Sequence, residues 1–290
     1  MSTNQYDAIV IGGGHNGLVN AAYLAKAGLK TIVLERRHIV GGAAITEELV
    51  PGFHFTTFSY AISLLRPDIV HELDLVKHGM MVLPMPTSFT PTDDGDYLLM
   101  GPDSETNYTE IERHSKRDAE AYHEYSNLMD RVCHAVKPLL DEIPPDITSD
   151  DPEELLRMAH LGKHLKLLDP EVLQMFIRLI SGSASDILDD YFESEVLKAS
   201  IASSSIIGSK VGPRSQGSGL VLLFHKLGEI DGVFGEWGFH KKGNGGFTKA
   251  VARAAEAFGA EIRLEAGVAR VIVSGGEATG VALENGEELH

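Results

Sequence analysis

A glycine-rich turn near the N-terminus carries the clearest chemical signal in this sequence. Residues Gly12–Gly17 read GGGHNG, and the acid Glu35 follows Gly12 by 23 residues. In a GxGxxG turn the first glycine permits a tight turn, the second lets the backbone approach a pyrophosphate, and the third allows close helix–sheet packing. Gly12, Gly14 and Gly17 stand at these positions. An acid at the spacing of Glu35 accepts ribose hydroxyls and disfavours a 2′-phosphate, so the pattern predicts a site for the ADP part of FAD or NAD.

The elements that must position this turn are a strand before it and a helix and a second strand after it. Tyr6–Ile11 is a short β-branched apolar run, typical of a buried parallel strand. Leu18–Ala27 is expected to be a helix, and Thr31–Leu34 a second buried strand. The start of the helix would offer N–H groups and the positive end of its dipole to phosphates. His15 and Asn16, which lie in the turn, are therefore included with the glycines as nucleotide-binding residues.

The rest of the chain divides into a helical middle and a second α/β segment. Apolar residues recur every three or four positions, which predicts helices over 118–140, from 151 to 165, over 170–180 and over 191–201. Near the end, the pattern predicts a helix and three strands, over Phe247–Phe258, Glu261–Leu264, Val268–Val273 and Gly280–Leu283. Strand and helix patterns therefore recur on both sides of a helical insertion.

From this order we predict an α/β fold in which the two ends of the chain form one domain. The strands Tyr6–Ile11 and Thr31–Leu34 are apolar on both faces, so they need helices on both sides and partner strands at their edges. The first α/β unit alone cannot supply that cover. We therefore expect a discontinuous nucleotide-binding domain with a parallel sheet, residues 1–65 and 232–290, interrupted by a mostly helical substrate or cap lobe, residues 66–231.

Composition and charge exclude several classes of function. The formal net charge of −17 opposes the attraction to phosphate on which nucleic-acid binders rely, so no nucleic-acid partner is expected. The single cysteine, Cys133, excludes an internal disulfide and a CxxC redox pair. No stretch approaches the ~20 apolar residues of a membrane span, and residues 1–5 show no signal-peptide core. We expect a cytoplasmic protein, or one of the mitochondrial matrix if the source is eukaryotic.

Three further groups of residues could carry chemistry, and each has an ordinary structural explanation. His160 and His164 have the spacing of two metal ligands on one helix face, but no third ligand is evident, so we expect a solvated face and no metal. Cys133 lies in an amphipathic pattern and is expected to be buried. His240–Lys242 precede the glycine turn Gly243–Gly246, where they either place positive charge near an anionic ligand or form a solvated loop.

The segment after the second strand resembles a known family. Residues 35–42 (ERRHIVGG) are similar to the acid, arginine and double-glycine segment of FAD flavoproteins of the amine oxidase and phytoene desaturase superfamily. The resemblance implies that Glu35 binds the adenosine ribose and that Arg37 helps to hold the nucleotide. It also implies that Gly41 and Gly42 lie under the pyrophosphate and ribityl chain. Ala43 stands where many amine oxidases have an arginine, which favours the phytoene desaturase side.

The resemblance extends along both ends of the chain and is diffuse across the middle. It covers PGFHF at 51–55, SY at 59–60, LLRP at 64–67, GGF at 245–247, GAEI at 259–262 and VARV at 268–271. It implies a Rossmann-like FAD-binding domain of the glutathione reductase type, in which the backbone of Val268 contacts the adenine. Members of the superfamily are considerably longer and bring a further glycine-bearing segment to the flavin. We therefore expect this chain to be the N-terminal part of such a protein, or to bind flavin incompletely without a partner.

The resemblance implies the function of an FAD-dependent oxidoreductase of the desaturase or dehydrogenase type. Such an enzyme moves a hydride between flavin N5 and a C–C or C–N bond of a hydrophobic small molecule, while the protein supplies position and electrostatics. No side chain is assigned as a catalytic acid or base. NAD is an alternative cofactor or a co-substrate. An NAD-dependent dehydrogenase is therefore one alternative function. A non-catalytic binding module on the same fold, like the GDP-dissociation inhibitors, is the alternative from another class.

Overall fold

The computed structural model describes residues 5–290, which divide into two compact units. The first unit contains the described residues up to Pro84 together with Trp237–His290, and the second contains Met85–Glu236. The first unit thus joins the two ends of the chain, and the second is an insertion between them. Ile9–Ile11 and Val268–Val273 lie in the same unit.

The divisions fall at 84 and 236, whereas the sequence suggested 65 and 231. Strand pairing supplies the physical reason. Strand β5 (Val82–Pro84) pairs antiparallel with β10 (Gly238–His240), so the segment that ends at Pro84 is fixed to the first unit. Neither strand has a clear alternating pattern in the sequence. The nucleotide and substrate roles expected of the two parts stay predictions.

A three-stranded parallel sheet lies at the centre of the first unit. Its order is β1-β2-β11, formed by Ala8–Ile11, Thr31–Leu34 and Glu261–Arg263. Ile9 lies opposite Ile32, and Ile262 lies opposite Val33. The expected α/β fold with a Rossmann-like parallel sheet and a mostly helical middle region is confirmed.

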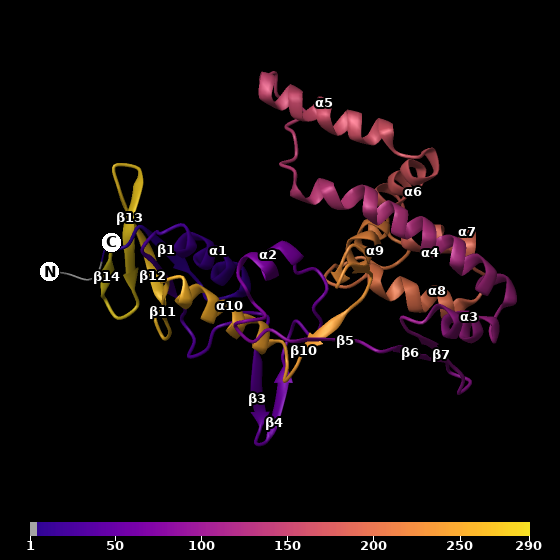
Figure 1. The fold of residues 1–290 in the computed structure, drawn as a ribbon, viewed down its shortest axis with the longest axis horizontal. Coiled ribbons are helices and arrows are strands. Elements are labelled where there is room, and N and C mark those ends of the chain that lie inside the picture. Colours follow the sequence, from indigo (N-terminus) through magenta and orange to yellow (C-terminus); the bar gives the residue numbers. More distant parts are fainter. Residues whose placement is uncertain (1–4) are drawn as a thin grey trace. The chain divides into compact units, whose positions relative to one another are not determined.

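The two faces of this sheet are covered by different kinds of structure. Helices α1 (His15–Lys26) and α10 (Gly245–Ala257) pack side by side, and Val33 of the central strand joins their core (Figure 1). Ile32 and Leu34 point into a second core, which is shared with a sheet of order β12-β13-β14. Those strands are antiparallel and comprise Val268–Ser274, Glu277–Leu283 and Glu288–Leu289. The expectation of helices on both faces is therefore wrong, because an amphipathic sheet buries apolar side chains equally well.

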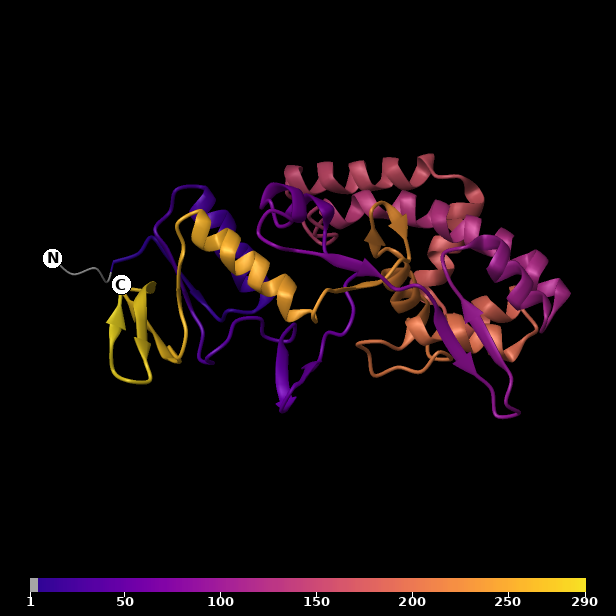
Figure 2. The ribbon, with the colours of Figure 1, turned by 60° about the horizontal axis from the view of Figure 1, so that its bottom comes forward.

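The remaining elements of the first unit follow the second strand. A hairpin of β3 (Thr46–Val50) and β4 (Phe53–Thr56) projects from this unit, as both ribbon views show (Figures 1 and 2). Helix α2 (Pro67–Glu72) begins with a proline in its first turn, where no backbone donor is lost. The hydroxyl groups of Thr46 and Thr56 in this hairpin accept hydrogen bonds from the backbone at the start of α10.

The second unit is mostly helical. Its helices are α3 (Ser104–Glu112), α4 (Lys116–Val136), η1 (Lys137–Asp141), α5 (Pro152–Leu167), α6 (Pro170–Ser181), α7 (Ala184–Tyr191), α8 (Glu195–Ala202), η2 (Ser203–Ser205) and α9 (Ser218–Lys226). Two short hairpins, which the sequence did not predict, pair β6 (Ser88–Pro91) with β7 (Tyr97–Met100), and β8 (Glu229–Ile230) with β9 (Val233–Phe234). Their strands have two to four residues, too few for a clear periodic pattern.

One predicted helix of this unit is wrong. The pattern over 191–201 was expected to be continuous, but α7 ends at Tyr191 and α8 begins at Glu195. The buried carboxylate of Asp118, from the first turn of α4, accepts the N–H groups of Glu193 (2.9 Å) and Ser194 (2.7 Å). A distant side chain therefore caps the start of α8 and holds the break between the helices.

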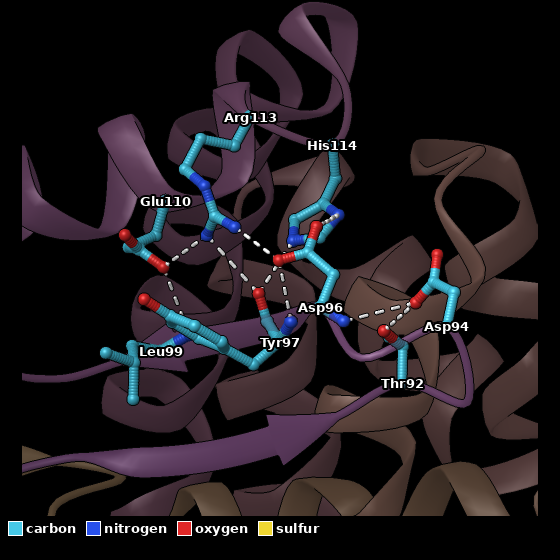
Figure 3. Close-up of polar contacts among 8 residues, drawn as sticks. All are labelled: Thr92, Asp94, Asp96, Tyr97, Leu99, Glu110, Arg113 and His114. Atoms are coloured by element: carbon cyan, nitrogen blue, oxygen red, sulfur yellow. Dashed lines mark hydrogen bonds and ion pairs between the residues drawn. The ribbon is translucent and has the colours of Figure 1, made fainter.

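The β6–β7 hairpin is fixed to α3 by a small group of polar contacts (Figure 3). The Arg113 guanidinium lies 2.5 Å from Asp96 and 2.9 Å from Glu110, and it also stacks over the Tyr97 ring. The Tyr97 N–H and then the Arg113 charge hold the pKa of Asp96 below its ordinary value. These side chains are largely exposed, and exposed ion pairs contribute little to stability, so the group mainly sets the local geometry.

The expected burial of Cys133 is confirmed, and burial raises the pKa of its thiol to about 12. Such a thiol is protonated near neutral pH and is a poor nucleophile. His164 faces the Ala135 carbonyl at 2.8 Å. Among residues 5–290 no group of three or more metal-ligating side chains occurs, and no helix in that range is long and apolar enough to cross a membrane.

Candidate functional site

The turn between β1 and α1 is shaped by its first and last glycines. Gly12 has φ +100°, a conformation that side chains rarely adopt, and its N–H donates to the Leu34 carbonyl at 2.8 Å. A Cβ on Gly17 would lie 2.2 Å from the Gly12 carbonyl oxygen and 3.3 Å from Val10. The fold therefore requires glycine at both positions, whatever the turn binds.

Gly14 is different, because neither its conformation nor its packing requires glycine. Its φ of −71° and ψ of 169° suit any residue. A Cβ built there would meet only the Gly42 Cα, at the ordinary contact distance of 3.9 Å. A side chain at this position would occupy open space beside the start of α1. That vacant space is what a pyrophosphate needs in order to approach the backbone closely.

The start of α1 presents backbone donors without acceptors. The Leu18 N–H is bonded to the Gly14 carbonyl, and Gly14 forms a parallel bridge with Gly41. The N–H groups of Asn16 and Gly17 have no acceptor within residues 5–290. No side chain caps the helix, and its first turn contains no acid. The two free donors and the positive end of the helix dipole together form the arrangement that binds phosphate in proteins.

A second glycine turn lies directly against the first. The Gly41 N–H donates to the Gly13 carbonyl at 2.8 Å, and a Cβ on Gly42 would approach the Gly14 Cα to 3.1 Å. Gly41 has φ +131° and Gly42 has φ +57°. The structure therefore brings together the two glycine turns that the sequence singled out separately.

Glu35, which is 7% exposed, is held at the end of β2 by two backbone donors. One carboxylate oxygen accepts the Gly13 N–H at 2.7 Å, and the other accepts the Arg37 N–H at 2.9 Å. Each oxygen retains a lone pair for a further donor such as a ribose hydroxyl. Glu35 thus orients the glycine turn through Gly13. Its expected contact with the ribose stays a prediction.

Arg37 and Val268 lie near this acid. The Arg37 guanidinium pairs with Glu47 of β3 at 2.5 Å, a contact that the resemblance did not imply. The connection from β11 to β12 runs along residues 35–37, because the Ala266 N–H donates to the Glu35 carbonyl and the Glu265 N–H to the Arg37 carbonyl. Val268 begins β12 just beyond this connection and packs against the second core. The ligand roles of all these residues stay predictions.

The other glycine turn that precedes a helix, Gly243–Gly246, has no free donors. The Asn244 N–H donates to the Thr56 hydroxyl (3.1 Å) and the Gly245 N–H to the Thr46 hydroxyl (2.9 Å). The next two N–H groups bond to the Gly243 and Asn244 carbonyls. His240 is buried, with its ring nitrogens 2.7 and 3.2 Å from the Lys241 and Gly79 carbonyls. The solvated loop is confirmed for Lys241 and Lys242, which are exposed, and is wrong for His240, which protein contacts bury. A role of the lysines toward an anionic ligand stays a prediction.

Sequence reasoning missed two residues that shape the site. Thr46 satisfies the start of α10, and Glu47 pairs with Arg37. The alternation in Thr46–Val50 is too weak to reveal a strand, and ion pairs across ten residues have no local signature. The acidic pair Glu47-Glu48 close to Arg36-Arg37 was the only available signal.

Comparison with known proteins agrees with this geometry. Residues 10–73 match the family model of the NAD(P)-binding Rossmann-like domain. The chain is 43% identical, over 98% of its length, to "pyridine nucleotide-disulfide oxidoreductase domain-containing protein 2" of Mus musculus, and covers 52% of that protein. It is 28% identical to hydroxyneurosporene desaturase of Cereibacter sphaeroides, over 97% of this chain and 54% of the desaturase. The chain spans about half the length of these curated relatives.

Solved structures share the fold at low sequence identity. The Rab GDI of Plasmodium falciparum matches with a TM-score of 0.55 and 12% identity, over 99% of this chain and 64% of that chain. Putrescine oxidase, solved with bound putrescine, matches with a TM-score of 0.54 and 20% identity, over 98% of this chain and 56% of that chain. These solved structures share the fold of the chain, and the curated relatives show that it is similar to FAD/NAD(P)-binding Rossmann-like oxidoreductases and desaturases.

Proposed function

We propose that this chain provides the dinucleotide-binding part of an FAD-dependent oxidoreductase that acts on a C–C or C–N bond of a hydrophobic small molecule. The observation that carries the proposal is the start of α1, where Asn16 and Gly17 present free N–H groups beside the open space at Gly14. A binding module that holds no dinucleotide has no need of such a cradle. FAD is preferred to NAD because of the resemblance of residues 35–42 to flavoproteins.

The residues around the turn have distinct roles in this proposal. The free N–H groups of α1 donate to pyrophosphate oxygens, and the helix dipole adds to the attraction. Glu35 accepts the ribose hydroxyls with the lone pairs that Gly13 and Arg37 leave available. Gly41 and Gly42 allow the second turn to lie against the first, because a Cβ on Gly42 would approach the Gly14 Cα to 3.1 Å. When bound, the flavin itself supplies the hydride chemistry at N5.

Two alternatives make different predictions for ligand binding. The first alternative is a non-catalytic module on the fold shared with Rab GDI, which would bind a hydrophobic partner without a dinucleotide. The second alternative is NAD as the cofactor, because the matching family model is that of an NAD(P)-binding domain. The relative affinities for FAD and NAD distinguish this alternative from the proposal.

The test is equilibrium dialysis of the purified product of the native reading frame against FAD, NAD and ADP-ribose, with a visible spectrum recorded beforehand. We expect a yellow protein, or uptake of FAD in preference to NAD. ADP-ribose should compete, because the site recognises the part common to both cofactors. A colourless protein that takes up none of the three ligands would favour the binding module. Preference for NAD would favour the dehydrogenase.

A further inference from the structure

The contact between Glu47 and Arg37 bears on which nucleotide the site accepts. Arg37 follows the ribose acid Glu35 by two residues, and its N–H donates to the Glu35 carboxylate. Its guanidinium lies 2.5 Å from a Glu47 oxygen, and the side chains of the two partners are 37% and 23% exposed. The other Glu47 oxygen accepts the Thr57 hydroxyl at 3.4 Å, so two contacts hold Glu47.

An arginine near the ribose acid is the kind of group that accommodates a 2′-phosphate in NADP sites. A free guanidinium would bind the phosphate through two parallel hydrogen bonds. Here the guanidinium already has a carboxylate partner, which neutralises its charge and occupies part of its donor fork. A 2′-phosphate would have to displace Glu47 and would also lie near two carboxylates.

We infer that Glu47 is a specificity-determining residue, which excludes 2′-phosphorylated dinucleotides by holding Arg37. It acts through Arg37 and is therefore a positioning residue. The inference rests on the proposed function, since it concerns the same ribose site. Glu35 alone gives only part of this discrimination, because an arginine two residues away would otherwise offset its charge.

The neighbouring Arg36 could also bind a 2′-phosphate, so the experiment must distinguish it from Arg37. Arg36 is exposed and forms no ion pair within the part of the chain that the structure describes. If Arg36 recognised the phosphate, the partner of Arg37 would be irrelevant. A variant that removes both Glu47 and Arg37 distinguishes the two arginines, because it leaves Arg36 in place.

The experiment measures the affinities of ADP-ribose and 2′-phospho-ADP-ribose by calorimetry, for the wild type and three variants. In Glu47→Gln the affinity ratio should shift toward the 2′-phosphorylated probe by about tenfold, which corresponds to about one charge-assisted hydrogen bond. Glu48→Gln is the matched control, since Glu48 lies on the same strand and contacts only the Gly52 N–H. It should leave the ratio unchanged. Glu47→Gln/Arg37→Gln should lose the gain.

A purely structural role of Glu47 would weaken both probes equally and leave their ratio unchanged. That result, with the wild type binding ADP-ribose normally, would overturn this inference and leave the proposed function intact. A gain that persists in the double variant would also overturn it, because Arg36 would then be responsible. A folded wild type that binds neither probe would overturn the proposed function and this inference together.

Discussion

Helices α1 and α10 begin in similar sequences, but the N–H groups at their starts have different hydrogen-bond partners. Both follow glycine-rich turns, both lie in the first unit, and they pack against each other on one face of the parallel sheet (Figure 1). At α1 the N–H groups of Asn16 and Gly17 are free. At α10 the two threonines Thr56 and Thr46 accept the first N–H groups, and carbonyls of the turn accept the next two. Glycines before a helix therefore indicate an anion site only where no other part of the protein supplies acceptors.

The reasons for the glycines differ in the same way. A Cβ on Gly245 would come within 2.6 Å of the Thr46 nitrogen, and one on Gly243 within 2.4 Å of the Thr46 hydroxyl. These glycines are needed for packing between α10 and β3. A Cβ on Gly14 would meet no close neighbour. Space beside the backbone is filled by protein at α10 and is left open at α1.

The largest expected effect tests the open space at α1. Gly14→Ala should weaken FAD binding by about 2–3 kcal/mol, or roughly 30- to 150-fold, because the methyl group would lie where the pyrophosphate approaches. The free energy of unfolding should fall by at most about 1 kcal/mol, since alanine is a poorer N-cap than glycine. Equilibrium dialysis and urea unfolding of the ligand-free protein measure the two quantities. FAD affinity equal to that of the wild type would show that the space is not a ligand site.

The matched substitution at α10 should have the opposite outcome. Gly245→Ala should lower the free energy of unfolding by about 1–3 kcal/mol, because its Cβ would collide with the backbone of β3. The folded fraction should bind FAD with little change, since no ligand contact is expected there. Urea unfolding checks the first value, and dialysis below the unfolding transition checks the second. A selective loss of FAD binding at full stability would place a ligand at α10 and remove the contrast.

Glu35 sharpens the comparison, because it orients the α1 turn and is also expected to contact the ribose. Glu35→Ala should weaken FAD binding by at least about tenfold, since two charge-assisted hydrogen bonds are lost. It should also lower stability, because the Gly13 and Arg37 N–H groups lose their acceptor. Glu35→Gln retains one acceptor oxygen and should lose less of both. Unchanged FAD affinity in Glu35→Ala would leave the acid with a purely structural role.

The smallest expected effect concerns the acceptor at α10. Thr46→Val keeps the shape of the side chain and removes the oxygen that accepts the Gly245 N–H. The free energy of unfolding should fall by about 1 kcal/mol, the cost of one unpaired donor, and FAD affinity should be unchanged. Thr279→Val, at an exposed position of β13, is the control and should have almost no effect. Equal stability of the two variants would show that water replaces the threonine at the start of α10.

The local patterns predicted most of the first unit. Thr31–Leu34 is a strand with the bounds expected, and the first and last helices begin within three residues of their expected starts. The two helices show apolar periodicity and end before glycines, and the strand is an unbroken apolar run after Thr31. These signals depend only on neighbouring residues. The break at 192–194 and the β3–β4 hairpin were missed, because the first depends on Asp118 and the second has an irregular pattern.

By itself, the sequence determined the parallel sheet, the glycine turn after β1, the acid after the second strand and the resemblance to Rossmann-like oxidoreductases. Only the tertiary structure decided that an antiparallel sheet covers the second face, that Glu47 holds Arg37, and that Thr46 and Thr56 satisfy α10. The physical reason is the range of the interactions. Hydrophobic periodicity and glycine geometry act within a few residues, whereas hydrogen-bond acceptors and ion-pair partners come from strands that only folding brings close.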